Sequence, residues 1–236
     1  ALDTACSSAL VAVQLAMQSL RLGQSELALA LGANLILHPS SMLGLAATQA
    51  LSPDGRCRSF DAQAKGYVRA EGVGAVALAR LDDARSRGWP VLAVIRGGAV
   101  NQDGRSTGLT TPNRLAQEEL LRSALDDAGL SPDSLGYIEA HGTGTPLGDP
   151  IEIEALQAVM GAPRPDGSRL RVGSIKANVG HGEAMAGLSG LARLVLQLQR
   201  GRIYAHPHLR RLNPRLRLER SCLEIPAAAL DWEEGE

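Results

Sequence analysis

The chain has 236 residues, of which 44% are hydrophobic and 21% are charged, and its formal net charge is −1. This composition is typical of globular proteins and excludes the disordered and fibrous classes. The balanced charge offers no basic block for nucleic acid, and no uncharged apolar stretch reaches the roughly 18 residues that cross a bilayer, so we expect neither a nucleic-acid nor a membrane role.

The cysteines are too few and too widely spaced for a disulfide framework or a zinc ribbon, since Cys6, Cys57 and Cys222 form no CxxC pair. We therefore expect a reducing compartment, the cytoplasm. Lysine occurs only at Lys65 and Lys176, against 22 arginines. The first residues contain neither an initiator methionine nor a signal peptide, so we expect a piece of a longer polypeptide.

Hydrophobic periodicity and turn residues predict the elements of the first part of the chain. In chain order they are a buried helix over residues 9–22, a strand over 26–37, a short helix over 42–51, a long glycine-bearing loop over 52–72 and a strand over 74–81. A structureless connection of the length of this loop is usually functional or part of an interface.

The second part alternates strands and helices. The predicted elements are a strand over residues 91–100, a helix over 113–128, a strand over 135–140, a helix over 150–160, a strand over 170–175 and a helix over 184–200. This order favours a largely parallel sheet covered by helices, in which chemistry collects where strands end and helices begin. We expect an α/β protein with two related halves, residues 1–88 and 89–236.

Cys6 is the first candidate for a catalytic residue. It precedes a predicted buried helix, whose free N–H groups and dipole stabilise a thiolate, so we expect a lowered pKa and a nucleophile. The alternative is a small buried hydrophobic residue. Cys57 and Cys222 lack this setting and are interpreted as structural.

His141 is the second candidate, because it follows the strand predicted over residues 135–140 and opens a turn rich in glycine and threonine. Asp149 and Glu152 are interpreted as the N-cap and the capping-box glutamate of the next helix. The alternative is an ordinary turn with a locally bonded histidine. The Gly-Lys-Ser/Thr ending of a phosphate-binding loop is absent.

Lys176 and His181 lie together at the end of the strand predicted over residues 170–175. An ammonium near the imidazole would favour the neutral ring and attract an anion. The alternative is a solvated lysine beside a packing histidine. His206 and His208 lack an acidic or cysteine partner, so we expect no metal site, and His38 is interpreted as the polar end of its strand.

Three segments resemble the active-site blocks of β-ketoacyl synthases, and they occur in the same order and at similar spacing. These are residues 3–8 (DTACSS), 139–145 (EAHGTGT) and 173–181 (GSIKANVGH). Residues 52–57 (SPDGRC) and 101–104 (NQDG) are more similar to the ketosynthase domain of type I modular polyketide synthases than to the separate enzymes of fatty-acid synthesis.

This resemblance implies a thiolase-like fold of two α/β halves, a homodimer, and decarboxylative Claisen condensation of an enzyme-bound acyl chain with a malonyl-type extender on an acyl carrier protein. Cys6 would carry the acyl chain, and His141 and His181 would promote decarboxylation and stabilise oxyanions. Lys176 would support both histidines.

The resemblance also implies the partners of the site. Thr143 and Thr145 would hold the phosphopantetheine arm of the carrier protein. We expect no intrinsic cofactor, and we expect an acyltransferase domain of the same synthase as a further partner.

The chain also departs from the family pattern. The stretch that precedes the cysteine and the C-terminal Gly-Phe-Gly loop are absent, so we expect a fold truncated at both ends, with exposed apolar faces that promote aggregation. Ala70 stands where the family usually has glycine.

Two alternative functions fit the residues less well. Another thiolase-fold acyltransferase would carry a second catalytic cysteine with a glycine two residues later, which Cys222 lacks. A non-catalytic partner or scaffold would be expected to have lost Cys6.

Overall fold

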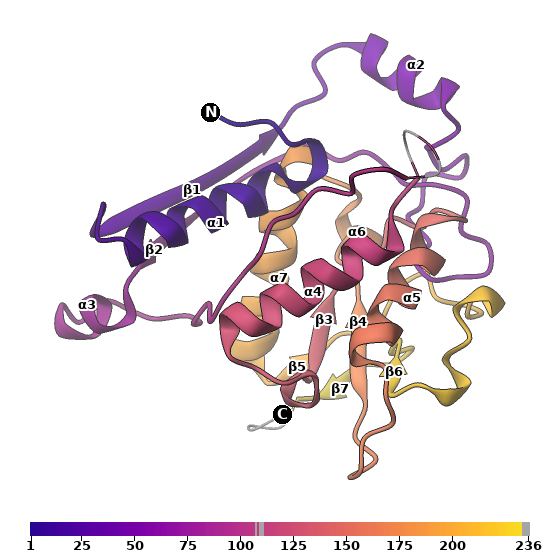
Figure 1. Ribbon diagram of the computed structural model, residues 1–236. Helices are drawn as coiled ribbons and strands as arrows, with labels where there is room; N and C mark the ends of the chain where they lie inside the picture. Colours follow the sequence, from indigo (N-terminus) through magenta and orange to yellow (C-terminus); the bar gives the residue numbers. More distant parts are fainter. Residues whose placement is uncertain (107, 109–110, 233–236) are drawn as a thin grey trace.

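The computed structural model describes residues 1–106, 108 and 111–232 (Figure 1). The helices are α1 (Ser8–Arg21), α2 (Pro39–Ala47), α3 (Leu81–Ser86), α4 (Arg114–Ala128), α5 (Gly148–Met160), α6 (Lys176–Val179) and α7 (Ala186–Arg200). The strands are β1 (Leu27–Asn34), β2 (Gly72–Ala79), β3 (Tyr137–Glu139), β4 (Leu170–Gly173), β5 (Arg202–Ile203), β6 (Leu223–Glu224) and β7 (Leu230–Asp231). Single 3-10 turns precede α1 at Ala5–Ser7 and α7 at Glu183–Met185.

Three strands form the parallel sheet that the alternation predicts. Strand β4 lies between β3 and β6, and both pairings are parallel. Strands β3 and β4 end near the predicted site residues, because His141 follows β3 by two positions and Lys176 follows β4 by three. The sheet therefore brings two of the three sequence segments to one edge.

The first part of the chain forms an antiparallel hairpin from β1 and β2, in register from the pair Leu27 and Ala79 to the pair Asn34 and Gly72. Helix α1 covers one face of this hairpin. Helix α7 contacts α1, both hairpin strands and β3, and Figure 1 shows it running between the hairpin and the parallel sheet. Helix α7 therefore joins the two parts of the molecule.

The strand predicted over residues 91–100 is wrong. All of these residues are described and none belongs to a strand. Their backbone groups bond side chains instead: Gln14 donates to the carbonyl of Gly98 at 3.1 Å, and the N–H of Gly98 donates to Asp127 at 2.9 Å. The segment is apolar enough for a strand, but it runs between α1 and α4 without a strand beside it.

Smaller differences concern the ends of elements. Strand β1 ends at Asn34, and His38 is not the end of a strand but the N-cap of α2, where its Nδ1 accepts the N–H of Ser40 at 3.2 Å. Helix α2 consequently begins three residues before the start of the helix predicted over residues 42–51. It ends at Ala47, before the predicted end at residue 51.

Two clusters of buried apolar side chains are found among the described residues. The smaller lies under the hairpin and comprises Ala9, Val13, Met17, Ala30 and Leu188. The larger surrounds the parallel sheet and includes Phe60, which is fully buried although it comes from the long loop over residues 52–72. The smaller cluster thus contains Leu188 from the second part of the chain, and the larger contains Phe60 from the first part. The division into halves at residues 1–88 and 89–236 remains a proposal.

Within the described ranges, no helix combines the length and the apolar character needed to cross a lipid bilayer.

Candidate functional site

Cys6 lies in the 3-10 turn Ala5–Ser7, directly before α1. The preceding residue, Ala5, has a φ of 54°, a left-handed conformation that side-chain-bearing residues adopt at a cost. Side chains of the same segment hold the turn, since the N–H of Thr4 donates to Ser8 and the Ser7 hydroxyl donates to the Thr4 carbonyl, both at 2.9 Å. The turn therefore presents Cys6 on a bent support at the start of a helix, as expected from the sequence.

The expectation of a lowered thiol pKa is wrong. Burial raises the pKa of the Cys6 thiol, the Glu183 carboxylate raises it further, and the Lys176 ammonium lowers it by less. A helix start by itself lowers the pKa of a thiol, whereas burial of the sulfur near a carboxylate favours the neutral thiol. The surroundings of Cys6 accordingly favour the protonated thiol.

His181 contacts Cys6, with its Nε2 atom 3.1 Å from Sγ. The Nδ1 atom on the opposite side of the ring accepts the backbone N–H of Glu183 at 3.1 Å. Because Nδ1 accepts, the neutral ring carries its proton on Nε2, and this proton faces the sulfur. Burial and then Lys176 lower the pKa of His181 to about 3, so the ring is neutral.

The backbone of His181 is held by the end of the loop over residues 52–72. Its N–H donates to the Val68 carbonyl at 2.7 Å, and its carbonyl accepts the N–H of Ala70 at 2.9 Å. The ring of Tyr67 packs edge-on against the imidazole, with 5.1 Å between the ring centroids. The loop thus supports the candidate site, in line with the expectation that a loop of this length has a function.

His141 lies next to His181, with 5.4 Å between their ring centroids. Its backbone is fixed by Glu152, which accepts the N–H groups of His141 at 2.6 Å and Gly142 at 2.8 Å. Desolvation, Lys176 and His181 together lower the pKa of His141 to about 3. Water at the exposed surface of His141 screens these charges, and the neutral ring remains the favoured form.

The cap interpretation of Asp149 and Glu152 is wrong. Helix α5 begins at Gly148 without a side-chain cap. The carboxylate of Asp149 instead accepts the N–H groups of Phe60 at 2.7 Å and Gly144 at 3.0 Å, and Glu152 holds the turn around His141. Both carboxylates accept hydrogen bonds from backbone N–H groups that lie outside helix α5.

Lys176 is buried, with 5% of its surface exposed, so the interpretation as a solvated surface lysine is excluded. Burial lowers the pKa of Lys176, while Glu152 and Glu139 oppose this shift. The ammonium lowers the pKa of Cys6, His141 and His181. Lys176 is therefore the positive charge that acts on all three predicted groups.

Thr143 and Thr145 lie on the turn after His141, with 3.3 Å between their hydroxyl oxygens. Thr143 is buried, whereas Thr145 is half-buried and accepts the N–H of Gly148 at 3.1 Å. The structure therefore brings the two hydroxyls to each other, beside His141.

Sequence reasoning missed two residues that support the site. Arg69 and Glu183 form a bidentate ion pair beside His181, with distances of 2.5 and 2.7 Å. The two residues are 114 positions apart along the chain, and no sequence pattern indicated this contact.

In the part of the chain that the structure describes, no group of three or more His, Cys, Asp or Glu side chains could hold a metal ion. His206 is buried and its Nε2 accepts the N–H of Ser174 at 3.2 Å. Cys57 and Cys222 are buried free thiols.

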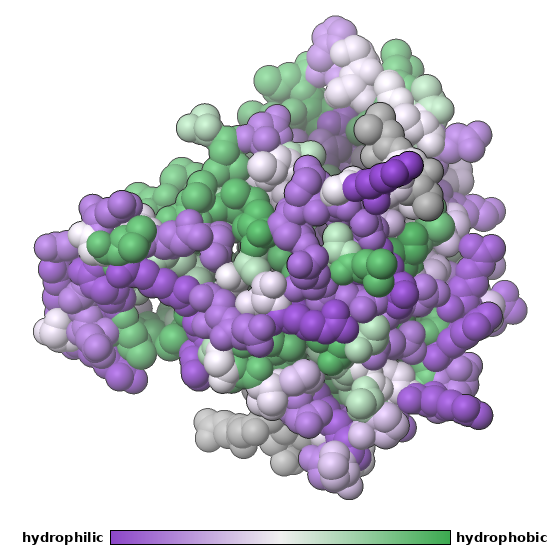
Figure 2. All heavy atoms as spheres, in the orientation of Figure 1, coloured by the Kyte–Doolittle hydropathy of each residue, from purple (hydrophilic) through white to green (hydrophobic). Residues whose placement is uncertain are grey.

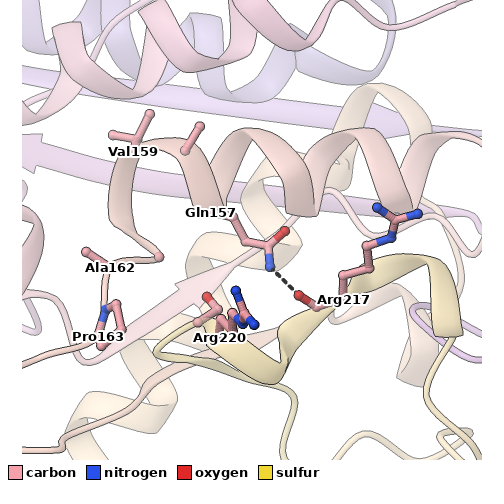
Figure 3. Close-up of a pocket in the computed structure, with 9 residues that line it drawn as sticks. Gln157, Val159, Ala162, Pro163, Arg217 and Arg220 are labelled. Carbon is pink, nitrogen blue, oxygen red and sulfur yellow. Dashed lines mark hydrogen bonds between the residues drawn. The ribbon is translucent and has the colours of Figure 1, made fainter.

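A surface pocket of about 330 Å³ lies at the end of α5 (Figure 3). Figure 3 shows Gln157 donating to the backbone carbonyl of Arg217, a bond of 3.0 Å. None of the predicted site residues lines this pocket.

Comparison with known proteins identifies the same family along most of the chain. Residues 1–84 match the family described as "Beta-ketoacyl synthase, N-terminal domain", and residues 92–210 match "Beta-ketoacyl synthase, C-terminal domain". Among curated proteins, one polypeptide of the phenolphthiocerol/phthiocerol polyketide synthase of Mycobacterium tuberculosis is 50% identical over 232 residues, which cover 98% of this chain and 12% of that protein. A second polypeptide of the same synthase is 51% identical over 233 residues, covering 98% of this chain and 13% of the relative.

Solved ketosynthases share the fold. An oxazolomycin ketosynthase domain from Streptomyces albus superposes with a TM-score of 0.94 at 44% identity, covering 98% of this chain and 40% of that one. The ketosynthase from module 6 of the bacillaene synthase of Bacillus subtilis 168 gives a TM-score of 0.94 at 36% identity, covering 100% of this chain and 42% of that one. These matches confirm the expected thiolase-like α/β fold. The chain spans about an eighth of the length of the curated relatives and about two fifths of the solved ketosynthases.

Proposed function

The chain belongs to the β-ketoacyl synthase family, and on this premise we propose that it carries the condensing site of a polyketide ketosynthase. The observation that carries the proposal is the pairing of Cys6 with a neutral His181 whose Nε2–H faces the sulfur at 3.1 Å. A sulfur nucleophile next to a fixed hydrogen-bond donor suits chemistry in which negative charge develops on a thioester.

In the first step, Cys6 takes the acyl chain from a carrier thioester. Its sulfur attacks the thioester carbonyl and loses its proton, the carbon–sulfur bond to the carrier arm breaks, and the carrier leaves as a free thiol. The Lys176 ammonium favours the thiolate, as its effect on the pKa of Cys6 indicates. His181 does not remove the proton as a base through Nε2, because that atom already carries one.

In the second step, a malonyl-type thioester loses carbon dioxide. The carbon–carbon bond breaks, its electron pair forms an enolate, and the enolate oxygen is stabilised by the N–H groups of the neutral His141 and His181. The enolate carbon then attacks the carbonyl on Cys6 and forms the new carbon–carbon bond. The carbon–sulfur bond breaks with its electron pair on sulfur, the lengthened chain leaves on the carrier arm, and the Cys6 thiolate takes up a proton from solvent.

The extender in this proposal arrives on the phosphopantetheine arm of an acyl carrier protein. Thr143 and Thr145 supply adjacent hydroxyls beside His141 for the amides of that arm. We further propose a homodimer in the cytoplasm, acting with an acyltransferase domain of the same synthase and without an intrinsic cofactor.

The test separates the two steps in the complete protein. His141→Ala and His181→Ala remove donors needed by the enolate, so we expect decarboxylation of malonyl-carrier protein to fall by on the order of 100-fold or more. Acylation of Cys6, measured by mass spectrometry, should fall much less, and Cys6→Ala should abolish it.

The matched control is His208→Ala, a half-buried histidine outside the site, which should leave both steps unchanged. If either His141→Ala or His181→Ala preserves both steps, the roles given to the histidines are wrong. Acylation that persists in Cys6→Ala would overturn the role of the cysteine.

A further inference from the structure

The turn that carries His181 is joined to the loop over residues 52–72 by a side-chain ion pair as well as by backbone hydrogen bonds. Arg69 lies between Val68 and Ala70, whose backbone groups bond His181, and its guanidinium reaches Glu183 on the same turn as the histidine. Nε and Nη2 of Arg69 donate to the two carboxylate oxygens of Glu183 at 2.5 and 2.7 Å. Nη1 donates to the Ser41 hydroxyl of α2 at 2.9 Å.

This ion pair is largely withdrawn from water, since the Arg69 side chain is 6% exposed and that of Glu183 is 19% exposed. A bidentate pair fixes both position and orientation of the carboxylate, which a single contact does not. An exposed pair of this kind would contribute little. The arrangement therefore fixes the Glu183 side chain in one place.

The backbone of Glu183 needs such a support. Its φ is 45°, in the left-handed region that favours glycine. A strained residue of this kind persists only where its surroundings hold it. In this conformation its N–H donates to Nδ1 of His181 at 3.1 Å, so the strained residue is the one that sets the tautomer of the imidazole.

We propose that the Arg69–Glu183 ion pair is a positioning device for the site. It holds the Glu183 N–H on Nδ1 of His181 and thereby keeps the Nε2–H of the ring directed at Cys6. The inference rests on the proposed function for its effect on turnover, although the tautomer itself does not depend on turnover.

The ion pair has a second, electrostatic consequence. The titratable groups that act on or contact Cys6 are Glu183, Lys176, His181 and Tyr67. The Glu183 carboxylate raises the pKa of the thiol, and Arg69, which pairs with it, offsets part of that negative charge. From the opposite charges of the two partners we expect them to act on the thiol with opposite signs.

Four variants in the complete protein separate the charge effect from positioning. In Glu183→Gln the carboxylate charge is lost, so the pH midpoint of Cys6 alkylation by iodoacetamide should fall by about half a unit, a roughly threefold gain in thiolate. In Arg69→Met the carboxylate is left uncompensated, so the midpoint should rise. Arg69→Lys should keep the alkylation midpoint close to that of the unmodified protein, because it keeps the charge, but it should lose part of the decarboxylation because an ammonium cannot form the bidentate contact.

Decarboxylation of malonyl-carrier protein reports the positioning role. Glu183→Gln keeps one of the two hydrogen bonds from Arg69, because its amide oxygen accepts and its amide nitrogen does not, so it should lose less decarboxylation than Glu183→Ala. Glu183→Ala should lower the alkylation midpoint as Glu183→Gln does, but it should lose decarboxylation on the order of tenfold, as should Arg69→Met. Arg87→Met, which breaks the exposed Arg87–Glu26 pair of 2.7 Å, is the control and should change neither property.

A spectroscopic measurement decides the proposal even if the proposed function fails. With ¹⁵N label in the five histidines, and the His181 signal assigned by its loss in His181→Ala, the unmodified protein should show the Nε2–H tautomer. Arg69→Met and Glu183→Ala should mix the two tautomers. An unchanged tautomer in both variants, or alkylation midpoints that move in the same direction in Arg69→Met and Glu183→Gln, would overturn the inference.

Discussion

The two lysines of the chain lie in opposite environments. Lys65 is exposed on the long loop, whereas Lys176 is buried and acts electrostatically on Cys6 and both histidines. A buried ammonium is costly to desolvate unless it is compensated, and the charges of Glu152 and Glu139 compensate it. Burial and then this ammonium favour the neutral imidazoles, and the ammonium also favours the thiolate. The proposed chemistry needs both of these states.

Lys176→Met removes this charge and should shift the pH dependence of decarboxylation. His181 supports the reaction only as a neutral ring, so activity is lost as pH falls through its pKa, which burial and Lys176 lower to about 3. Without the ammonium the pKa rises toward its ordinary value of about 6.5, and the acid limb of the pH–rate profile should move to higher pH.

The same change should raise the pH midpoint of Cys6 alkylation, because Lys176 lowers the pKa of the thiol. Lys65→Met is the matched control and should leave both profiles in place. An acid limb that stays where it is in Lys176→Met would show that the ammonium does not act on the imidazole.

At the scale of elements, the contact between α1 and α7 sets the position of Cys6. Gly187, in the first turn of α7, lies against Leu10 of α1, four residues after Cys6. A Cβ at position 187 would lie 2.5 Å from the Leu10 side chain and 3.0 Å from its backbone nitrogen. The absence of a side chain therefore allows the approach that brings the start of α1 to His181.

Gly187→Ala should push the two helices apart. Overpacking of a close contact costs about 1–3 kcal/mol, partly offset by about 1 kcal/mol from the higher helix propensity of alanine. We expect a lower free energy of unfolding and slower acylation of Cys6, because the start of α1 that holds the thiol shifts.

Gly44→Ala in α2 is the matched control for this substitution, since a Cβ there meets no atom within 4 Å. It should be neutral or stabilising by up to about 1 kcal/mol. Equal stability and equal acylation rates in the two variants would show that the helix contact does not position the cysteine.

At the scale of the whole molecule, one face of the hairpin is left uncovered. Alternate residues of β1 and β2 pack on α1 and α7, and the others face outward, including Leu29 at 63%, Leu31 at 61% and Val73 at 71% exposure. Hydrophobic residues are visible at the surface over the region of β1 and α1 in Figure 2. Contiguous apolar surface of this kind promotes association.

Replacing Leu29 and Leu31 together by lysine should reduce self-association of the 236-residue chain, because charges on a strand face oppose apolar contacts. Sedimentation velocity and light scattering as a function of concentration provide the measurement. Leu115→Lys changes an isolated leucine with 65% exposure on α4 and should have little effect. Unchanged association in the double variant would exclude this face as its origin.

Residue patterns along the chain predicted the candidate site residues and much of the architecture. The blocks around Cys6, His141 and His181 were identifiable because their residue types and order are specific, and strands β3 and β4 were predicted from apolar runs that end at those blocks. The helices over residues 9–22, 113–128 and 184–200 were predicted closely, since apolar periodicity and a following glycine depend on local sequence alone.

Only the tertiary structure decided what surrounds these residues. Residues 91–100 have the composition of a strand but form none, because a strand needs a neighbour and composition does not supply one. The pKa of Cys6 rises where a helix start alone would lower it, since burial and Glu183 outweigh the local field. The Arg69–Glu183 pair joins residues 114 positions apart, and electrostatic effects of this kind depend on distances through space that a linear pattern does not encode.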